Sequence, residues 1–101
     1  MAHLFDPLHP AVLNLVHQII RTANQANVPV ALCGEIAGDP TLTRLLLGFG
    51  LRQFSMHPSN LLSVKQQVLK TSLPEAVSTA HKILKAEEPD KVRALLARLN
   101  A

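Results

Sequence analysis

The sequence predicts an α/β fold in which helices alternate with two short parallel strands. Residues 10–26 carry apolar side chains at helical spacing, residues 28–33 form an apolar run without alternation, and residues 52–56 form a second short strand after an intervening helix. Alternating strands and helices favour right-handed crossovers and a parallel sheet. Two parallel strands alone make a weak sheet, because parallel pairs need cover on both faces. We therefore expect a slice of a larger α/β domain that is rich in helix when isolated.

The first half of the chain gives clear signals for where elements begin and end. Pro10 suits the first helical position of residues 10–26, and Asn27 follows the last. The strand at 28–33 reads VPVALC, which is typical of a strand buried on both faces. Residues 34–38 are expected to form a loop. Asp39 followed by Pro40 predicts the cap and first residue of a short helix that ends at residue 47.

The second half predicts three helices after the second strand. Gly48 and Gly50 mark the end of the preceding helix, and residues 57–60 are expected to turn into a helix over 60–70. Ser72 and Glu75 have the spacing of a capping box for a helix that runs to about residue 86. The last helix, residues 89–99, is expected to have a solvated face over an apolar stripe of Val92, Leu95, Leu96 and Leu99, for which another subunit is one possible partner. We interpret residues 1–101 as one partial domain, with 72–101 as a helical extension.

Composition limits the class of protein. A chain of 101 residues supports at most one domain of ordinary size. Apolar residues make up 48% and charged residues 17%, a balance that argues against a disordered chain. This shortage of charge indicates that some apolar surface faces a partner, an oligomer or a remainder of the same protein.

Charge and cysteine content bear on partners and compartment. The formal charge of +3 is spread along the chain, and no Trp or Tyr is present to stack bases, so we expect no nucleic-acid partner. No apolar stretch reaches 18 residues, the first residues lack the order of a secretory signal, and the single Cys33 cannot form an internal disulfide. We expect a soluble cytoplasmic protein with no membrane partner.

Cys33 is the main candidate for chemistry. It ends a predicted parallel strand and precedes Gly34, and α/β folds place reacting groups in the loops beyond the carboxyl ends of strands. A thiol at this position can act as a nucleophile, a metal ligand or a proton donor. A small buried apolar side chain is the alternative, and position alone leaves these interpretations open.

The histidines are interpreted mainly as structural. His9 and His57 each precede a proline, and we expect both on the same face of the fold as Cys33. A zinc site built from these three residues is conceivable, but their spacing matches no zinc pattern, so helix capping or loop packing is preferred. His17 and His81 are expected to be solvated helix residues, and His3 lies in the terminal segment.

Two carboxylates near Cys33 have different interpretations. Asp39 is explained as a helix cap. Glu35 is left open: it either orients the loop that presents Cys33 or contacts a neighbouring strand, and we do not assign it a catalytic role. Phe54 and Met56 are expected in the core.

Several motifs, taken together, resemble one enzyme family. They are LFDPLHPAVL at 4–13, CGEIAGDP at 33–40, LLLGFGL at 45–51 and FSM at 54–56. Their order and spacing are similar to the C-terminal end of the phosphoenolpyruvate-protein phosphotransferases, enzyme I of the bacterial sugar phosphotransferase system. The resemblance covers the chain to about Lys70 and is vague in the last thirty residues.

The resemblance implies a fold and a role for Cys33. The family's C-terminal domain is a (β/α)₈ TIM-type barrel that binds phosphoenolpyruvate and Mg²⁺. Residues 28–33 and 52–56 would be its seventh and eighth strands, and residues 61–70 would lie in the closing helix. The family's cysteine matches Cys33, which implies that it donates a proton to enolpyruvate. A thiol with an ordinary pKa of about 8.5 is mostly protonated at neutral pH and can supply that proton.

The resemblance also implies what this stretch lacks. The family's Mg²⁺ ligands, phosphate-binding arginines and phosphoryl-accepting histidine lie upstream of the matching region, so the isolated chain is expected to be inactive. The phosphocarrier protein would bind through the missing N-terminal region, and a homo-oligomer is expected. Alternatives are a fragment of pyruvate phosphate dikinase or phosphoenolpyruvate synthase, or a non-catalytic oligomerisation or interaction module.

Overall fold

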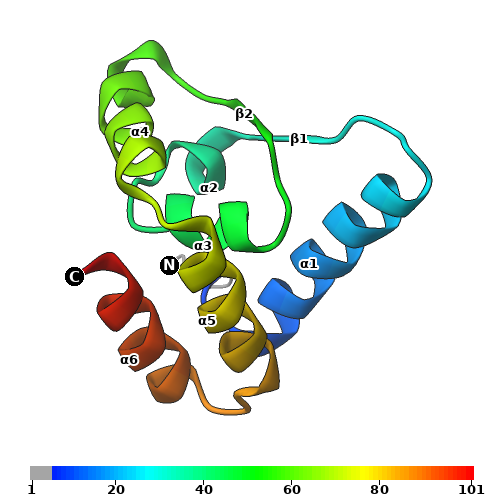
Figure 1. Cartoon of the computed structure of the whole chain (residues 1–101), viewed down its shortest axis with the longest axis vertical. Helices are drawn as coiled ribbons and strands as arrows, with labels where there is room; N and C mark the ends of the chain where they lie inside the picture. The colour runs from blue at the N-terminus through cyan, green and yellow to red at the C-terminus, as the bar shows by residue number, and fades with distance from the viewer. Residues whose placement is uncertain (1–5) are drawn as a thin grey trace.

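Helices dominate the computed structural model, which describes residues 6–101 apart from the side chain of Cys33. Along the chain lie α1 (Pro10–Gln25), β1 (Ala31–Cys33), α2 (Gly34–Gly38), α3 (Thr43–Gly48), β2 (Gln53–Ser55), α4 (Pro58–Lys70), α5 (Leu73–Lys85) and α6 (Pro89–Asn100). The structure is a small, mostly helical domain with a small sheet (Figure 1).

The two strands are parallel, as predicted, and they pair with each other. Ala31 lies opposite Gln53, and Cys33 lies opposite Ser55. Each strand has only three residues, so the predicted bounds 28–33 and 52–56 were too long. The difference has a physical cause: Val28 donates its N–H to the Ala23 carbonyl at the end of α1, and Pro29 has no N–H to donate to a ladder.

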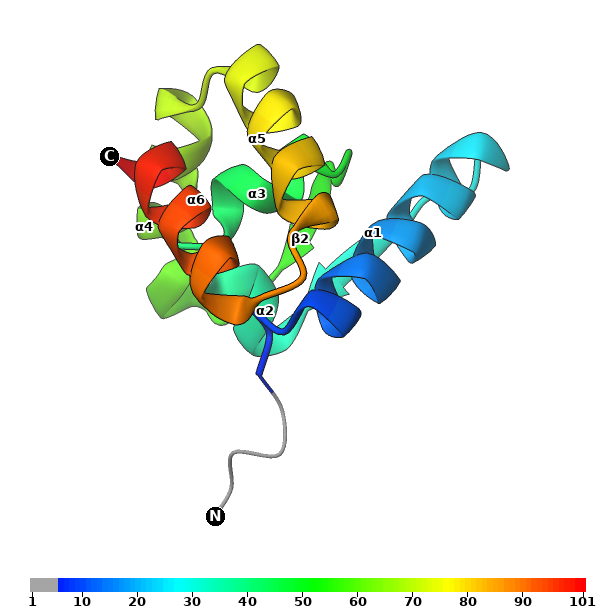
Figure 2. The same ribbon diagram turned by 90° about the horizontal axis from the view of Figure 1, so that it is seen from below.

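The core is built around α3. This helix packs most extensively against α5, which in turn packs against α6. The helix α1 stands to one side of these helices (Figure 2) and reaches the core mainly through Leu13 and Ile20. The buried core cluster contains Leu13, Ile20, Leu42, Leu45, Leu46, Phe49, Leu51, Ala80, Ile83, Val92, Leu95 and Leu96. The apolar stripe of α6 is therefore buried largely within the chain itself.

The end of α3 follows the glycine signal in the sequence. Gly50 has φ +102° and donates its N–H to Leu47, while the Leu51 N–H bonds to the Leu46 carbonyl. This pair of bonds defines a Schellman motif, in which glycine takes the left-handed position without steric cost. Leu51 is fully buried, which supplies the apolar contact that accompanies such a cap.

Three local expectations were wrong. Residues 34–38 form the short helix α2 rather than a loop, and α3 begins at Thr43 instead of residue 40. Asp39 caps a turn instead, because its Oδ1 accepts from the Thr41 N–H at 2.9 Å and from the Thr41 hydroxyl at 2.7 Å. Ser72 precedes α5 but makes no capping hydrogen bond through its side chain, so the capping box does not form.

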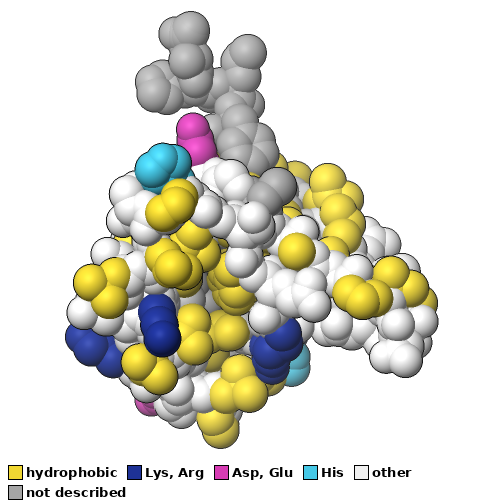
Figure 3. Space-filling model, turned by 90° about the horizontal axis from the view of Figure 1, so that it is seen from above, with side chains coloured by type: hydrophobic (Ala, Val, Ile, Leu, Met, Phe, Trp, Pro, Cys, Tyr) yellow, Lys and Arg dark blue, Asp and Glu magenta, His cyan; other side chains and the backbone are white. Residues whose placement is uncertain are grey.

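Two helices expose large apolar side chains. On α4 only Val64 is buried, whereas Leu62 and Leu69 are 69% and 75% exposed. On the side of α1, Leu15, Ile19 and Val28 are about half exposed. Hydrophobic side chains are spread over the face seen in Figure 3. These helices therefore have more apolar surface than the contacts within residues 6–101 cover.

Candidate functional site

Cys33 lies at the corner where the chain leaves the sheet. It is the last residue of β1, in register with the last residue of β2, so the carboxyl ends of both strands are adjacent. Gly34 follows at φ +78°, a left-handed conformation that turns the backbone directly into α2. The backbone therefore has the expected placement for a reactive residue. The Cys33 side chain lies outside the described part of the structure, so its role stays a prediction.

The end of α2 packs closely against the start of α4. Gly38 is buried, and a Cβ built there would lie 2.8 Å from the Asn60 Nδ2 and 3.4 Å from the Met56 Cβ. The absence of a side chain at Gly38 thus lets α2 approach the start of α4. This contact fixes the segment that follows Cys33 against the segment that follows β2.

Glu35 and Asp39 share a small hollow. The hollow has a volume of about 130 Å³ and is also lined by Pro7, Ile36 and Leu42. Glu35 is exposed on α2, and Asp39 is already engaged by Thr41. Glu35 forms no ion pair with another residue of the described 6–101 range. The hollow therefore contains one carboxylate that stabilises a turn and one that is exposed to solvent.

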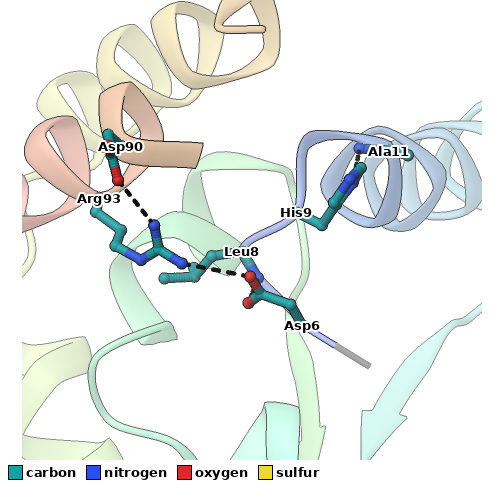
Figure 4. A network of polar contacts seen from close by, with 6 residues as sticks. All are labelled: Asp6, Leu8, His9, Ala11, Asp90 and Arg93. Atoms are coloured by element: carbon teal, nitrogen blue, oxygen red, sulfur yellow. Dashed lines mark hydrogen bonds and ion pairs between the residues drawn. The ribbon is translucent and has the colours of Figure 1, made fainter. Parts of the chain in front are cut away.

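His9 and His57 are helix caps, which confirms the preferred interpretation. The His9 Nδ1 accepts from the Ala11 N–H at 3.1 Å, and the His57 Nδ1 accepts from the Ser59 N–H at 3.1 Å. Figure 4 shows the His9 cap. Each proline sits at the first helical position, where a missing N–H costs nothing.

The described side chains do not form a cluster of metal ligands. Among the described residues, no three His, Cys, Asp or Glu side chains converge. The zinc site with His9 and His57 includes the Cys33 side chain, which is not described, so it stays a prediction, and the resemblance places the Mg²⁺ ligands upstream of the matching region. We therefore derive no chemical step of this chain through a metal.

His17 differs from the prediction of a solvated residue. Its ring lies 5.2 Å from the Phe49 ring, tilted by 59°, and the side chain is half-buried. Burial lowers the pKa of His17 below 6.5, and Arg21 and His81 lower it further by charge repulsion. The partial burial of His17 could have been predicted from helical spacing. His17 follows Leu13 by four residues and precedes Ile20 by three, and both of these residues are buried. His81 is exposed, as predicted.

A polar network ties the segment before α1 to α6 (Figure 4). The Arg93 guanidinium bonds to Asp6 at 3.4 Å and to Asp90 at 3.1 Å, and the Asp6 carboxylate also accepts from the Leu8 N–H at 2.9 Å. Both ion pairs are exposed to solvent, where such pairs contribute at most about 1 kcal/mol. This network orients the start of α1 more than it stabilises the fold.

One family model covers most of the chain. Residues 1–73 match the model of the PEP-binding domain of PEP-utilising enzymes. The chain belongs to this family.

The relatives point to one branch of that family. The chain is 57% identical over 99 residues to the phosphoenolpyruvate-protein phosphotransferase of Cupriavidus necator. It is 36% identical over 96 residues to the protein of that name from Bacillus subtilis. These matches cover 98% and 95% of this chain but only 17% of each relative. The similarity to the first relative thus extends through the last thirty residues, where the motifs alone were vague.

Within residues 6–101, no helix is both long enough and apolar enough to cross a membrane.

Proposed function

We propose that this chain is the C-terminal part of the PEP-binding domain of a phosphoenolpyruvate-protein phosphotransferase, in which Cys33 protonates enolpyruvate. The observation that carries the proposal is the family match combined with the backbone position of Cys33 beside the carboxyl ends of two parallel strands. The whole enzyme would transfer a phosphoryl group from phosphoenolpyruvate to a protein histidine. The relatives' names favour this enzyme over pyruvate phosphate dikinase and phosphoenolpyruvate synthase.

The chain's own surface supports a place within a longer polypeptide. Within residues 6–101, the sheet has two strands, and neither pairs with another strand on its outer edge. An apolar hollow of about 460 Å³ lies along α1, lined by Leu15, Ile19 and Val28 among others. Open strand edges and apolar helix faces need cover. In a (β/α)₈ barrel, further strands and helices would supply it, with β1 and β2 as the seventh and eighth strands.

The proposed chemistry assigns one proton transfer to this chain. Transfer of the phosphoryl group breaks the bond between phosphorus and the enol oxygen and leaves the enolate of pyruvate. The Cys33 thiol then gives its proton to the terminal carbon of that enolate, which yields pyruvate and a thiolate. Solvent returns the proton to the sulfur before the next turnover. A positioned general acid contributes about 10²–10⁴-fold to such a step.

The remaining expectations follow from the family and stay proposals. Mg²⁺ and the phosphoryl-accepting histidine would belong to residues outside this chain, as would the surface that binds the phosphocarrier protein. The enzyme would be a cytoplasmic protein of a sugar transport system. It would form a homo-oligomer, and residues 72–101 would be a helical extension of its PEP-binding domain.

A pair of variants in the longer protein tests the role of Cys33. Cys33→Ala should lower pyruvate formation at least about 100-fold, because the enolate then waits for a proton from water. Ser63→Ala, at an exposed position on α4, is the control and should leave the rate unchanged. A Cys33→Ala protein as fast as the control would exclude the thiol as proton donor.

A second experiment uses the 101-residue chain alone. With phosphoenolpyruvate and Mg²⁺, we expect no pyruvate above background, because charge stabilisation of the phosphoryl group needs groups outside this chain. Pyruvate that increases with protein and disappears in Cys33→Ala would show that the chain is a complete catalyst. Size-exclusion chromatography of the same sample measures whether the apolar faces drive self-association, as the oligomerisation alternative requires.

A further inference from the structure

A polar hollow lies where α3, α5 and α6 meet, outside the corner that holds Cys33. Its volume is about 220 Å³, and it is lined by the cationic side chains of Arg44, Lys82 and Arg98. Each cation comes from a different helix. Within residues 6–101, none of the three forms an ion pair with an Asp or Glu side chain. Three like charges thus face one cavity, and none of them is held by an ion pair to an Asp or Glu side chain.

Arg44 is held in place by the fold. Its Nε donates to the Gln67 Oε1 at 3.1 Å, and its Nη1 donates to the Leu99 carbonyl at 2.9 Å. Neither bond uses Nη2. A half-buried guanidinium fixed by two hydrogen bonds loses little conformational freedom when it binds an anion, and its planar donors match carboxylate and phosphate oxygens.

The other lining residues complete an anion site. Thr79 and Lys82 lie three residues apart on α5, which places a hydroxyl and an ammonium on neighbouring positions of one helix face. Leu95 and Leu99 line the hollow on the α6 side and reduce its contact with water. Glu75 and Ala101 also line the hollow, and with the Glu75 side chain and the terminal carboxylate of Ala101 counted, the lining of the 101-residue chain keeps a formal charge of +1.

We propose that this hollow binds a small anion with phosphoryl or carboxylate groups, at a site separate from the reaction centre. Phosphate oxygens would accept from Arg44 Nη2, Lys82 and Arg98, and the Thr79 hydroxyl would donate a further bond. Because the anion would contact α3, α5 and α6 together, it would stabilise the packing of these helices by mass action. The site does not depend on the proposed role of Cys33.

The test is a titration of the 101-residue chain, observed by ¹⁵N NMR, with inorganic phosphate in one arm and citrate in the other. Ionic strength is held constant with chloride. We expect saturable chemical-shift changes in the amides around Arg44, Thr79, Lys82 and Arg98 with at least one of the two anions. The anion that binds more tightly shows whether the site prefers a phosphoryl or a carboxylate group. Arg98→Gln and Lys82→Gln should each weaken binding about tenfold, as expected for the loss of one charge-assisted hydrogen bond.

Two further variants separate a site from general charge attraction. Lys91→Gln removes the same charge from an exposed position of α6 outside the hollow and should leave the affinity unchanged. Glu75→Gln removes the opposing carboxylate and should tighten binding. Shifts that do not saturate with either anion, equal weakening by Lys91→Gln, or unchanged affinity in both Arg98→Gln and Lys82→Gln would each overturn the proposal.

Discussion

Gly48 permits the closest approach of two helices in the core. A Cβ built at Gly48 would overlap the carbonyl oxygen of Ala76, lie 2.8 Å from the Ala76 carbonyl carbon and lie 3.1 Å from the Ala80 Cβ. The main obstacle is backbone of α5, which cannot rotate away as a flexible side chain does. In Gly48→Ala, α3 and α5 must therefore move apart at the most extensive helix contact of the fold.

The cost of Gly48→Ala follows from two opposing terms. Overpacking of a well-packed contact costs about 1–3 kcal/mol, whereas replacing glycine by alanine in a helix returns at most about 1 kcal/mol. Because the obstacle is backbone, the upper end of the overpacking range applies, and we expect a net loss of about 2 kcal/mol in the free energy of unfolding. For a domain of this size the midpoint of thermal unfolding would fall by roughly 8–16 °C.

Urea unfolding followed by circular dichroism measures this loss. Ala80→Gly in the Gly48→Ala background should recover little, because the overlap with the Ala76 carbonyl remains. Gly34→Ala is the matched control: among the described residues, no atom outside its chain neighbours and its own helix backbone lies within 4 Å of the built Cβ, so only the cost of a left-handed alanine, about 1 kcal/mol, is expected. A Gly48→Ala protein as stable as the natural sequence would refute the argument from packing.

Two further predictions concern histidines. The lowered pKa of His17 means that the folded state binds its proton less readily than the unfolded state, so stability should be fully present above pH 6.5 and fall as pH drops below it. Urea midpoints measured across this range should show a weaker pH dependence in His17→Gln, and an unchanged profile would contradict the assignment. His9→Ala and His57→Ala should each cost about 1 kcal/mol through loss of a helix cap, measured by thermal unfolding. The exposed His81→Ala on α5 is their control and should change stability by less than about 0.5 kcal/mol.

Local signals predicted most of the fold. The prolines at residues 10, 58 and 89 and the glycine at residue 50 act through the backbone of their immediate neighbours, and the corresponding helix boundaries lie within two residues of the expected ones. The same locality explains why α2 was missed. Its five residues have glycine at both ends, which gives a poor helix signal, and packing on both strands and α4 determines its conformation.

Burial was harder to predict than secondary structure. Helix α4 carries several large apolar side chains, but which of them is covered depends on elements distant in the sequence, and only Val64 is buried. The proposed anion site was also invisible in the sequence. Arg44 and Arg98 are 54 positions apart, and only the packing of α3 against α5 and α6 brings them to one hollow. Cys33, in contrast, was placed correctly at a strand end because the strand and the following glycine are adjacent in the chain.

The two histidine caps determine which ring nitrogen carries the proton. Since Nδ1 accepts a backbone N–H in both His9 and His57, a neutral ring must hold its hydrogen on Nε2. Both rings are exposed, so each presents an N–H donor outward at the start of a helix. Nitrogen chemical shifts would report this tautomer directly, and any molecule that docks beside either helix start meets a donor whose direction is set by the fold.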